Sequence, residues 1–252
     1  IAQLTADAPA YAAEKLATQA LADEEPALAI KHLDKAVALQ SAEAQFWLLR
    51  GQAWTMLEKP GNAEKSYTTA IAKNDGLFSP YLARGIVRYK QGKKSAAEID
   101  LRRSYTLLPT AAASYYLGEL ALDSKQYQQA QSYFQQAAQD RGELGNQSRA
   151  KIQQVNLQLQ PHTFLAFSQA VSSKGALLVT VVNTSSRAMR SIVLKIEGPL
   201  GQNGQSQTRT INLSKDLQSG QQLTINTGLN YFLPDQQVAR FRIAAQSAKL
   251  IE

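Results

Sequence analysis

The sequence predicts an α + β chain in which an all-α block of helical repeats is followed by a small all-β sandwich. Two observations carry this prediction. A pattern of small and large apolar residues recurs about every 34 residues in the N-terminal part. After Pro161 the period of the apolar residues changes from helical to alternating. We therefore divide the chain into residues 1–160 and residues 161–252.

The repeat is clearest in residues 44–77, where aromatic and small residues fall at fixed positions: Trp47, Gly51, Trp54, Ala63, Tyr67 and Ala70. Residues at the same positions recur in residues 10–43, 78–110 and 111–144, the last after a deletion of one residue. This pattern is similar to that of the tetratricopeptide repeat (TPR), a helix-turn-helix unit. The resemblance implies four repeats that stack into a right-handed superhelix.

Small residues at two positions of the repeat allow the two helices of each hairpin to approach closely. They are glycine on the first helix and alanine on the second: Gly51, Gly85, Gly118, Ala63, Ala97 and Ala130. Large side chains then fill the space between helix pairs, and we expect five aromatic residues to belong to this core: Trp47, Trp54, Tyr67, Tyr81 and Phe134.

Turn residues lie where each first helix must end, in residues 59–62, 91–94 and 123–126. Residues 145–158 predict one more amphipathic helix, because their apolar side chains recur at helical spacing. Such a helix caps the apolar face of the last repeat, and Pro161 ends it.

Beyond Pro161, strand-length runs of Val, Ile, Thr and Phe alternate with turn-rich segments: 163–171, 175–184, 189–198, 207–213, 221–228 and 238–245. In the third run Ile192, Leu194 and Ile196 share one face, which predicts a sheet with one buried side. The pair Asn203-Gly204 is typical of a hairpin turn. Six short strands in this length are similar to an immunoglobulin-like or fibronectin type III-like sandwich.

Two segments of the sequence resemble parts of bacterial envelope proteins. Residues 179–201 and 211–223 resemble small β-sandwich modules appended to such proteins. Residues 70–122 are similar to the C-terminal half of periplasmic zinc metalloproteases that carry TPRs behind their catalytic domain. The resemblance implies a periplasmic or envelope location and a catalytic domain upstream. A cytoplasmic location stays open, because a chain without cysteine fits either compartment.

The residues of this chain do not predict catalysis, a metal site or a cofactor. A zinc protease of the resembled family needs two histidines one helical turn apart in an HExxH helix. The sequence contains only His32 and His162, which are far apart, and neither precedes such a motif. Residues 198–205 lack the Lys-Ser/Thr of a phosphate-binding loop and are better explained as a hairpin turn. We therefore expect a chain that is not itself an enzyme.

The first helices of successive TPRs line a concave groove, and the resemblance places certain repeat positions on it. The groove residues predicted in this way come from three repeats: Gln45, Leu48, Gln52, Thr55, Leu82, Ile86, Tyr89, Lys90, Tyr115, Glu119 and Asp123. TPRs that bind the acidic tails of heat-shock chaperones carry lysine and asparagine where this sequence has Leu48 and Gln52. We expect a protein or peptide partner of another kind.

Alternatives for the partner and the role of the groove stay open. The groove can hold a separate protein segment, or it can pack against the β domain or against an N-terminal domain outside this chain. The excess of positive charge lies mainly in residues 161–252, with nine basic against four acidic side chains. These bases are spread out and no nucleic-acid-binding motif accompanies them, so we expect no nucleic-acid partner. We also expect no membrane span, because no apolar run is long enough.

Overall fold

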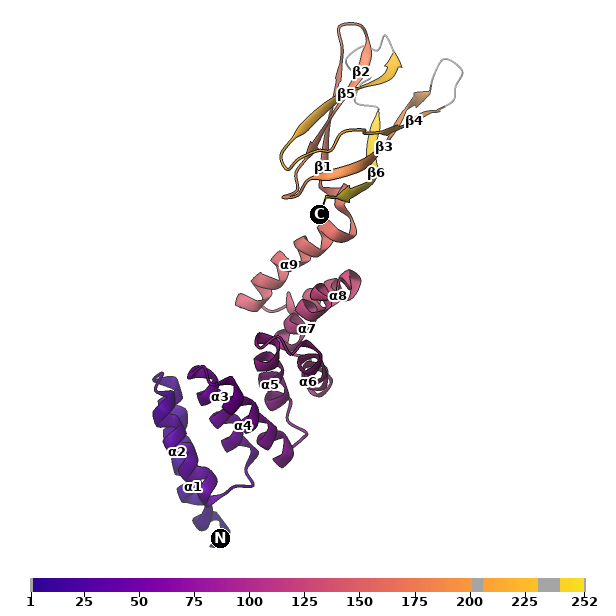
Figure 1. Cartoon of the computed structure of the whole chain (residues 1–252). Helices are drawn as coiled ribbons and strands as arrows, with labels where there is room; N and C mark the ends of the chain where they lie inside the picture. The colour runs from indigo at the N-terminus through magenta and orange to yellow at the C-terminus, as the bar shows by residue number, and fades with distance from the viewer. Residues whose placement is uncertain (1, 201–205, 231–240, 252) are drawn as a thin grey trace. The chain divides into compact units, whose positions relative to one another are not determined.

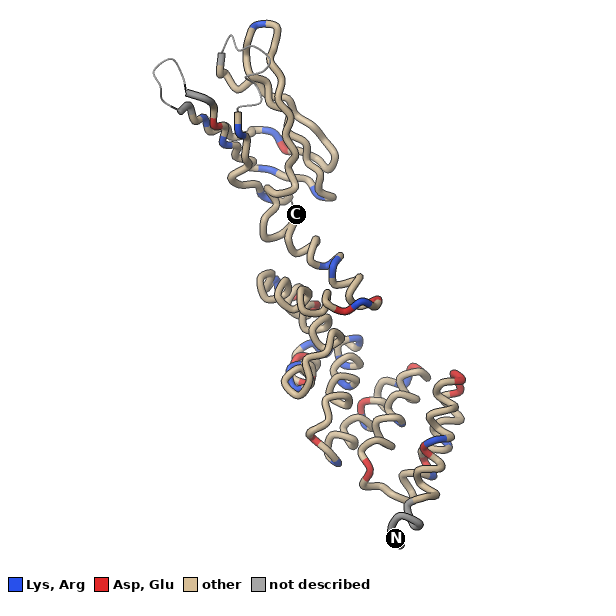
Figure 2. Tube along the Cα trace, turned by 180° about the vertical axis from the view of Figure 1, so that it is seen from behind, with Lys and Arg blue, Asp and Glu red and all other residues tan. Residues whose placement is uncertain are grey.

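The computed structural model describes residues 2–200, 206–230 and 241–251, and the chain divides into two compact units. The first unit contains residues 1–151 and the second residues 152–252. Helices make up the first unit, and strands of two antiparallel sheets make up most of the second (Figure 1, and from behind in Figure 2). The division between the units falls inside the last long helix.

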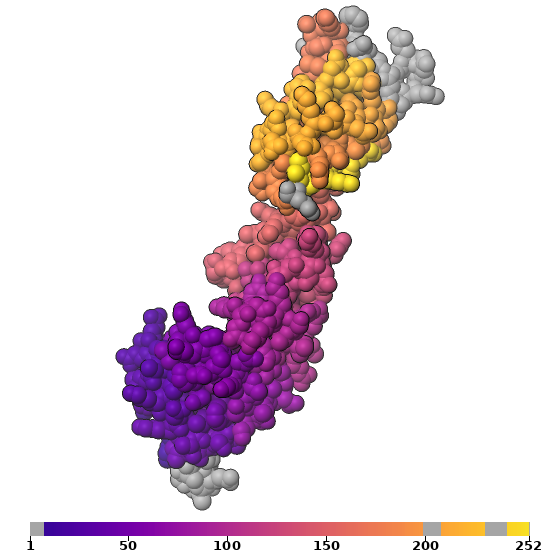
Figure 3. Space-filling view, viewed as in Figure 1, coloured from indigo at the N-terminus to yellow at the C-terminus, as the bar shows by residue number. Residues whose placement is uncertain are grey.

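Nine α-helices lie within the described residues. They are α1 (Ala2–Ala22), α2 (Pro26–Leu39), α3 (Ala44–Met56), α4 (Pro60–Lys73), α5 (Phe78–Lys90), α6 (Lys94–Leu107), α7 (Ala111–Asp123), α8 (Tyr127–Ala137) and α9 (Glu143–Leu159). The first eight pair into hairpins, α1 with α2 through α7 with α8, and each hairpin also contacts the next. In the space-filling view the repeats follow one another without a break, from indigo to magenta (Figure 3).

The four turns inside the hairpins share one backbone conformation. At the same repeat position each turn has a residue with positive φ: Glu24, Glu58, Gly92 and Lys125. The following amide donates to a carbonyl five residues earlier, as Lys59 N does to Trp54 O at 2.9 Å. This is the Schellman arrangement, which satisfies carbonyls at a helix C-terminus. The same conformation thus ends the first helix of all four hairpins.

Glycine on the first helix of a hairpin permits the close approach that its spacing predicts. A methyl group built on Gly118 would lie 2.7 Å from Phe134 Cε1, and one on Gly85 would lie 2.8 Å from Leu101 Cγ. The alanines of the second helices, Ala63, Ala97 and Ala130, are fully buried. These predictions are confirmed, because a larger residue at either place would push the paired helices apart.

The apolar core of the first unit is a series of small clusters between neighbouring helix pairs. Tyr67 and Phe134 are buried in the core, as predicted. Trp47, Trp54 and Tyr81 are only half-buried. The indole of Trp47 donates to Ser41 O at 3.0 Å, so this ring keeps its polar edge at the surface.

The second unit contains two three-stranded antiparallel sheets within its described residues. Its strands are β1 (Leu165–Val171), β2 (Ala176–Asn183), β3 (Met189–Leu200), β4 (Ser206–Asn212), β5 (Gln222–Asn230) and β6 (Arg242–Leu250). One sheet has the order β1-β2-β5 and the other β4-β3-β6 (Figure 1). A short 3₁₀ helix, η1 (Pro161–Phe164), precedes β1. Both sheets contribute residues to one hydrophobic cluster.

Alternation along β3 is confirmed, because Ile192, Leu194 and Ile196 are each at most 1% exposed. The prediction for the last strand differs from the structure, since β6 continues to Leu250. Its last residues pair with β3, and Lys249 lies opposite Arg190. Strand β3 supplies the hydrogen bonds that extend β6, although the last residues of β6 are poor strand formers. The predicted turn Asn203-Gly204 lies outside the described residues.

A buried asparagine at the end of β2 fixes two loops of the second unit. Asn183 is fully buried, and its amide donates to Arg187 O at 2.7 Å and Leu217 O at 2.9 Å. Its carbonyl oxygen accepts from the amide of Ser185 at 3.0 Å. The structure thus explains the Asn-x-Ser pattern at this strand end as an Asx turn. The immunoglobulin-like or fibronectin type III-like classification of the unit stays a prediction.

Candidate protein-binding groove

The predicted groove residues lie on α3, α5 and α7, the first helices of three successive repeats (Figure 1). Five of them are exposed: Gln45, Gln52, Thr55, Lys90 and Asp123. Five are half-buried: Leu82, Ile86, Tyr89, Tyr115 and Glu119. Leu48 is only 6% exposed and packs in the cluster between α3, α4 and α5, so it offers little surface to a partner.

A cavity of about 380 Å³ lies where the C-terminal ends of α3 and α5 meet the turn before α4. It is lined by Thr55, Glu58, Pro60, Val87, Lys90 and Gln91, and thus combines predicted groove residues of two repeats. The Thr55 hydroxyl contacts the Gly51 carbonyl at 2.9 Å and the Tyr67 hydroxyl at 3.0 Å. Met56, the last residue of α3, is 44% exposed but does not line this pocket.

Three tyrosines gather where α5 faces α7, and we call Tyr89, Tyr115 and Tyr116 the tyrosine cluster. The rings of Tyr89 and Tyr116 meet edge to face with centroids 5.4 Å apart. Tyr115 makes the same kind of contact with Tyr116 at 5.4 Å and with Phe134 at 5.8 Å. Edge-to-face pairs are favourable because the positive edge of one ring meets the negative face of another. The cluster joins repeat 3 to repeat 4.

Glu119 is the charged residue of the tyrosine cluster. Its carboxylate accepts a hydrogen bond from the Tyr89 hydroxyl at 3.4 Å and lies 2.8 Å from the ammonium of Lys151. Burial, and then the charges of Glu119 and Asp123, raise the pKa of Tyr89 to about 12. Burial and the Glu119 charge also raise the pKa values of Tyr115 and Tyr116. The three hydroxyls therefore stay protonated at neutral pH.

Two lysines that the sequence did not place in the groove neutralise its carboxylates. Lys151 from α9 pairs with Glu119, and Lys94 from α6 pairs with Asp123 at 3.0 Å. Glu119 and Asp123 lie one helical turn apart on α7, so both ion pairs are on the same side of this helix. A repeat pattern could not reveal these lysines, because they come from a second helix and from the capping helix.

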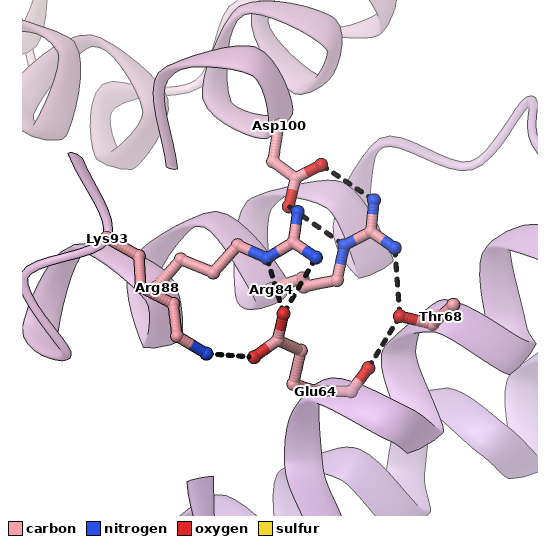
Figure 4. Close-up of polar contacts among 6 residues, drawn as sticks. All are labelled: Glu64, Thr68, Arg84, Arg88, Lys93 and Asp100. Carbon is pink, nitrogen blue, oxygen red and sulfur yellow. Dashed lines mark hydrogen bonds and ion pairs between the residues drawn. The ribbon is translucent and has the colours of Figure 1, made fainter. Parts of the chain in front are cut away.

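A buried charged network joins the second helix of repeat 2 to both helices of repeat 3 (Figure 4). The Asp100 side chain is only 2% exposed and accepts from Arg84 at 2.7 Å and from Arg88 at 2.9 Å. Arg88 also pairs with Glu64 at 2.7 Å, and Lys93 pairs with the same carboxylate at 2.9 Å. The Lys93 and Arg88 side chains lower the pKa of Glu64 below its usual value. The network therefore ties α4 of repeat 2 to α5 and α6 of repeat 3.

The two histidines lie in separate units, His32 on α2 and His162 on η1. Across residues 2–200, 206–230 and 241–251, no three histidine or acidic side chains come together in a way that could hold a metal ion. Within the same part of the chain, no helix combines the length and apolar character needed to cross a membrane.

The tetratricopeptide repeat family model matches residues 14–77 and 82–144, which is half of the sequence. The chain therefore belongs to the tetratricopeptide repeat family. No curated protein matches the sequence.

Several solved structures are similar to part of the chain. MamA (41-end) from Desulfovibrio magneticus RS-1 is 17% identical, with a TM-score of 0.53 over 59% of this chain and 84% of that one. The TPR domain of Arabidopsis OM64 is 21% identical, with a TM-score of 0.46 over 46% of this chain and 98% of that one. The first TPR of Spaghetti (RPAP3), bound to the HSP90 peptide SRMEEVD, is 21% identical, with a TM-score of 0.46 over 47% and 95%. The likeness to MamA concerns the fold alone.

Proposed function

We propose that this chain is a non-catalytic protein-interaction scaffold that holds a segment of another protein along the first helices of its repeats. One observation carries the proposal: the ends of α3 and α5 form an open pocket of about 380 Å³, lined in part by Thr55 and Lys90, two exposed residues of the predicted groove. An extended segment or a helix can place an apolar side chain in such a cavity while its backbone pairs with Gln45 and Gln52.

The location proposed for this scaffold is the bacterial cell envelope. It rests on the resemblance of residues 179–201 and 211–223 to β modules of envelope proteins, and the absence of cysteine is consistent with it. Fractionation of cells that express the full gene product tests the location. Recovery of the protein with cytoplasmic markers would contradict it.

A second candidate function is that the chain forms the substrate-recruiting or regulatory C-terminal part of a TPR-containing zinc metalloprotease. The similarity of residues 70–122 to such proteins favours it. In that case the groove binds either a protease substrate or the catalytic domain itself. The full open reading frame distinguishes the two candidates, because a protease requires an HExxH motif upstream of Ile1.

Selection of phage-displayed random dodecapeptides on the immobilised chain tests the groove. The groove variant is Gln52→Glu with Lys90→Glu, because both are exposed residues of the predicted groove and Lys90 lines the pocket. The matched control is Ile99→Glu, which changes a side chain that is 70% exposed on α6. Tyr89 and Tyr115 are poorer choices, because their rings pack against other aromatic residues and their loss affects stability as well.

The expected result is a set of peptides whose affinity falls about tenfold or more in the groove variant, which corresponds to about 1.4 kcal/mol or more. The same peptides bind the Ile99→Glu control as they bind the unchanged chain. Selection of no peptide, or equal binding by the groove variant, would contradict the proposed function.

A further inference from the structure

Glu119 sits in surroundings that are suited to a cation. Its side chain is only 15% exposed. The rings of Tyr115 and Tyr116 precede it by one turn on α7, and the Tyr89 hydroxyl approaches from α5. A carboxylate that is largely removed from water attracts a positive charge more strongly than one at the surface. Tyr115 and Tyr116 lie within reach of the Glu119 charge, since it raises the pKa of both hydroxyls, after the larger effect of burial.

Lys151 shows that an ammonium group fits this place. Its Nζ atom lies 2.8 Å from Glu119 Oε1, and its charge reaches Tyr115, whose pKa it lowers against the larger effect of burial. The lysine is not part of the repeats, since it comes from α9. Its side chain is 30% exposed, so a long flexible stem can carry the ammonium into water without unfolding the helix.

The same arrangement recurs one turn further along α7. Asp123 pairs with Lys94, whose side chain is 57% exposed. One face of α7 therefore presents two carboxylates, from residues that lie about 6 Å apart along the helix axis. Each carboxylate is neutralised by a lysine from another helix. The pair between Lys94 and Asp123 is exposed and therefore weak, typically below about 1 kcal/mol. The pair between Lys151 and Glu119 is less exposed and therefore stronger. A basic group of a ligand can take the place of either lysine, because its ion pair replaces the internal one.

We propose that this face of α7 binds a basic side chain of the partner, an arginine or a lysine, which takes the place of Lys151 on Glu119. The inference rests on the proposed function and specifies the class of partner: a positively charged protein segment. Arginine suits the site better than lysine, because its planar guanidinium can pair with the carboxylate through two hydrogen bonds. Asp123 offers a second, weaker position for a neighbouring basic residue of the same segment.

An array of dodecapeptides with random flanks tests the proposal. The central residue of each peptide is arginine, citrulline or glutamate. Citrulline has nearly the same shape as arginine but no charge. Three variants of the full chain are compared with the unchanged chain. Glu119→Gln removes the carboxylate, and Lys151→Gln removes the lysine that pairs with this carboxylate in the free chain. Glu98→Gln is the control, since it removes an acidic side chain paired with Arg102 on α6 and leaves α7 unchanged.

The unchanged chain is expected to prefer arginine peptides to their citrulline counterparts by about tenfold. Lys151→Gln raises the affinity for arginine peptides about threefold or more, because the arginine no longer competes with the Lys151 ammonium for Glu119. Glu119→Gln abolishes the preference, and Glu98→Gln preserves it. Circular dichroism of each variant confirms that the repeats remain folded.

The two proposals fail in different ways. If the chain binds peptides equally well with arginine, citrulline or glutamate at the centre, the basic partner is wrong and the scaffold function stands. If Lys151→Gln weakens rather than strengthens binding of arginine peptides, Lys151 is part of the binding surface and the proposed exchange is wrong. If neither the unchanged chain nor Lys151→Gln binds any peptide, both proposals are wrong.

Discussion

Replacing Asp100 by asparagine is expected to destabilise the middle of the repeat array strongly. Asp100 is 2% exposed and faces two arginine side chains, Arg84 and Arg88, which are 12% and 20% exposed. Asp100→Asn keeps the shape of the side chain but removes the negative charge, and its amide group turns donors toward the guanidinium donors. Arg84 then has no carboxylate partner, and Arg88 keeps only Glu64, which also pairs with Lys93 (Figure 4).

Removal of one partner from a buried ion pair costs about 3–5 kcal/mol, because the remaining charge is left without compensation. We expect the lower end of this range, about 3 kcal/mol, since Arg88 keeps its contact with Glu64 at 2.7 Å. With a urea dependence of about 2 kcal/mol per molar, the unfolding midpoint falls by about 1.5 M. Urea unfolding followed by circular dichroism at the helical band measures this shift.

Glu98→Gln on the same helix is the control for this measurement. Glu98 and Arg102 form an i,i+4 pair in which the side chains are 45% and 48% exposed, respectively, so its loss costs about 0.3–0.5 kcal/mol. The double variant Arg84→Met, Asp100→Leu is expected to recover part of the lost stability, because it removes both charges together. If Asp100→Asn and Glu98→Gln shift the midpoint equally, the network does not stabilise the array and the reasoning from burial is wrong.

Two further predictions concern packing and titration. Gly118→Ala is expected to lower the free energy of unfolding by about 1–3 kcal/mol, because the new methyl would lie 2.7 Å from Phe134. The control is Gly61→Ala, whose methyl would meet nothing within 4 Å, so this change should be neutral or stabilising. Equal effects of the two substitutions in urea unfolding would contradict the packing argument. Tyr89 should ionise near pH 12 in an absorbance titration compared with Tyr89→Phe. Since an unfolded tyrosine ionises near pH 10, its stabilising contribution is complete below about pH 10 and is lost as the pH rises toward 12. A titration in which Tyr89→Phe removes a component near pH 10 would show that the hydroxyl is not shielded.

Which groove residues are accessible could be predicted only in part from the repeat. The periodicity placed the eleven predicted residues on three first helices, as the structure has them. Leu48 nevertheless lies 6% exposed in a core cluster, while Tyr89 and Tyr115 divide their surface between packing and solvent. A repeat position gives the direction of a side chain relative to its own helix. How deeply the neighbouring helix covers that side chain depends on the packing of the whole array.

By itself the sequence determined the elements that depend on near neighbours: the recurring glycine and alanine positions, the turns between paired helices, and the alternation along β3. These features follow from local sterics and from the period of the apolar residues. Only the tertiary structure decided that β6 extends along β3, that Asp100 joins Arg84 to Arg88, and that Lys151 meets Glu119. The strand pairing joins backbone segments far apart in the chain, and the ion pairs join long side chains of different helices. The final packing of the helices and strands therefore decides which backbones pair and which charges come within reach of one another.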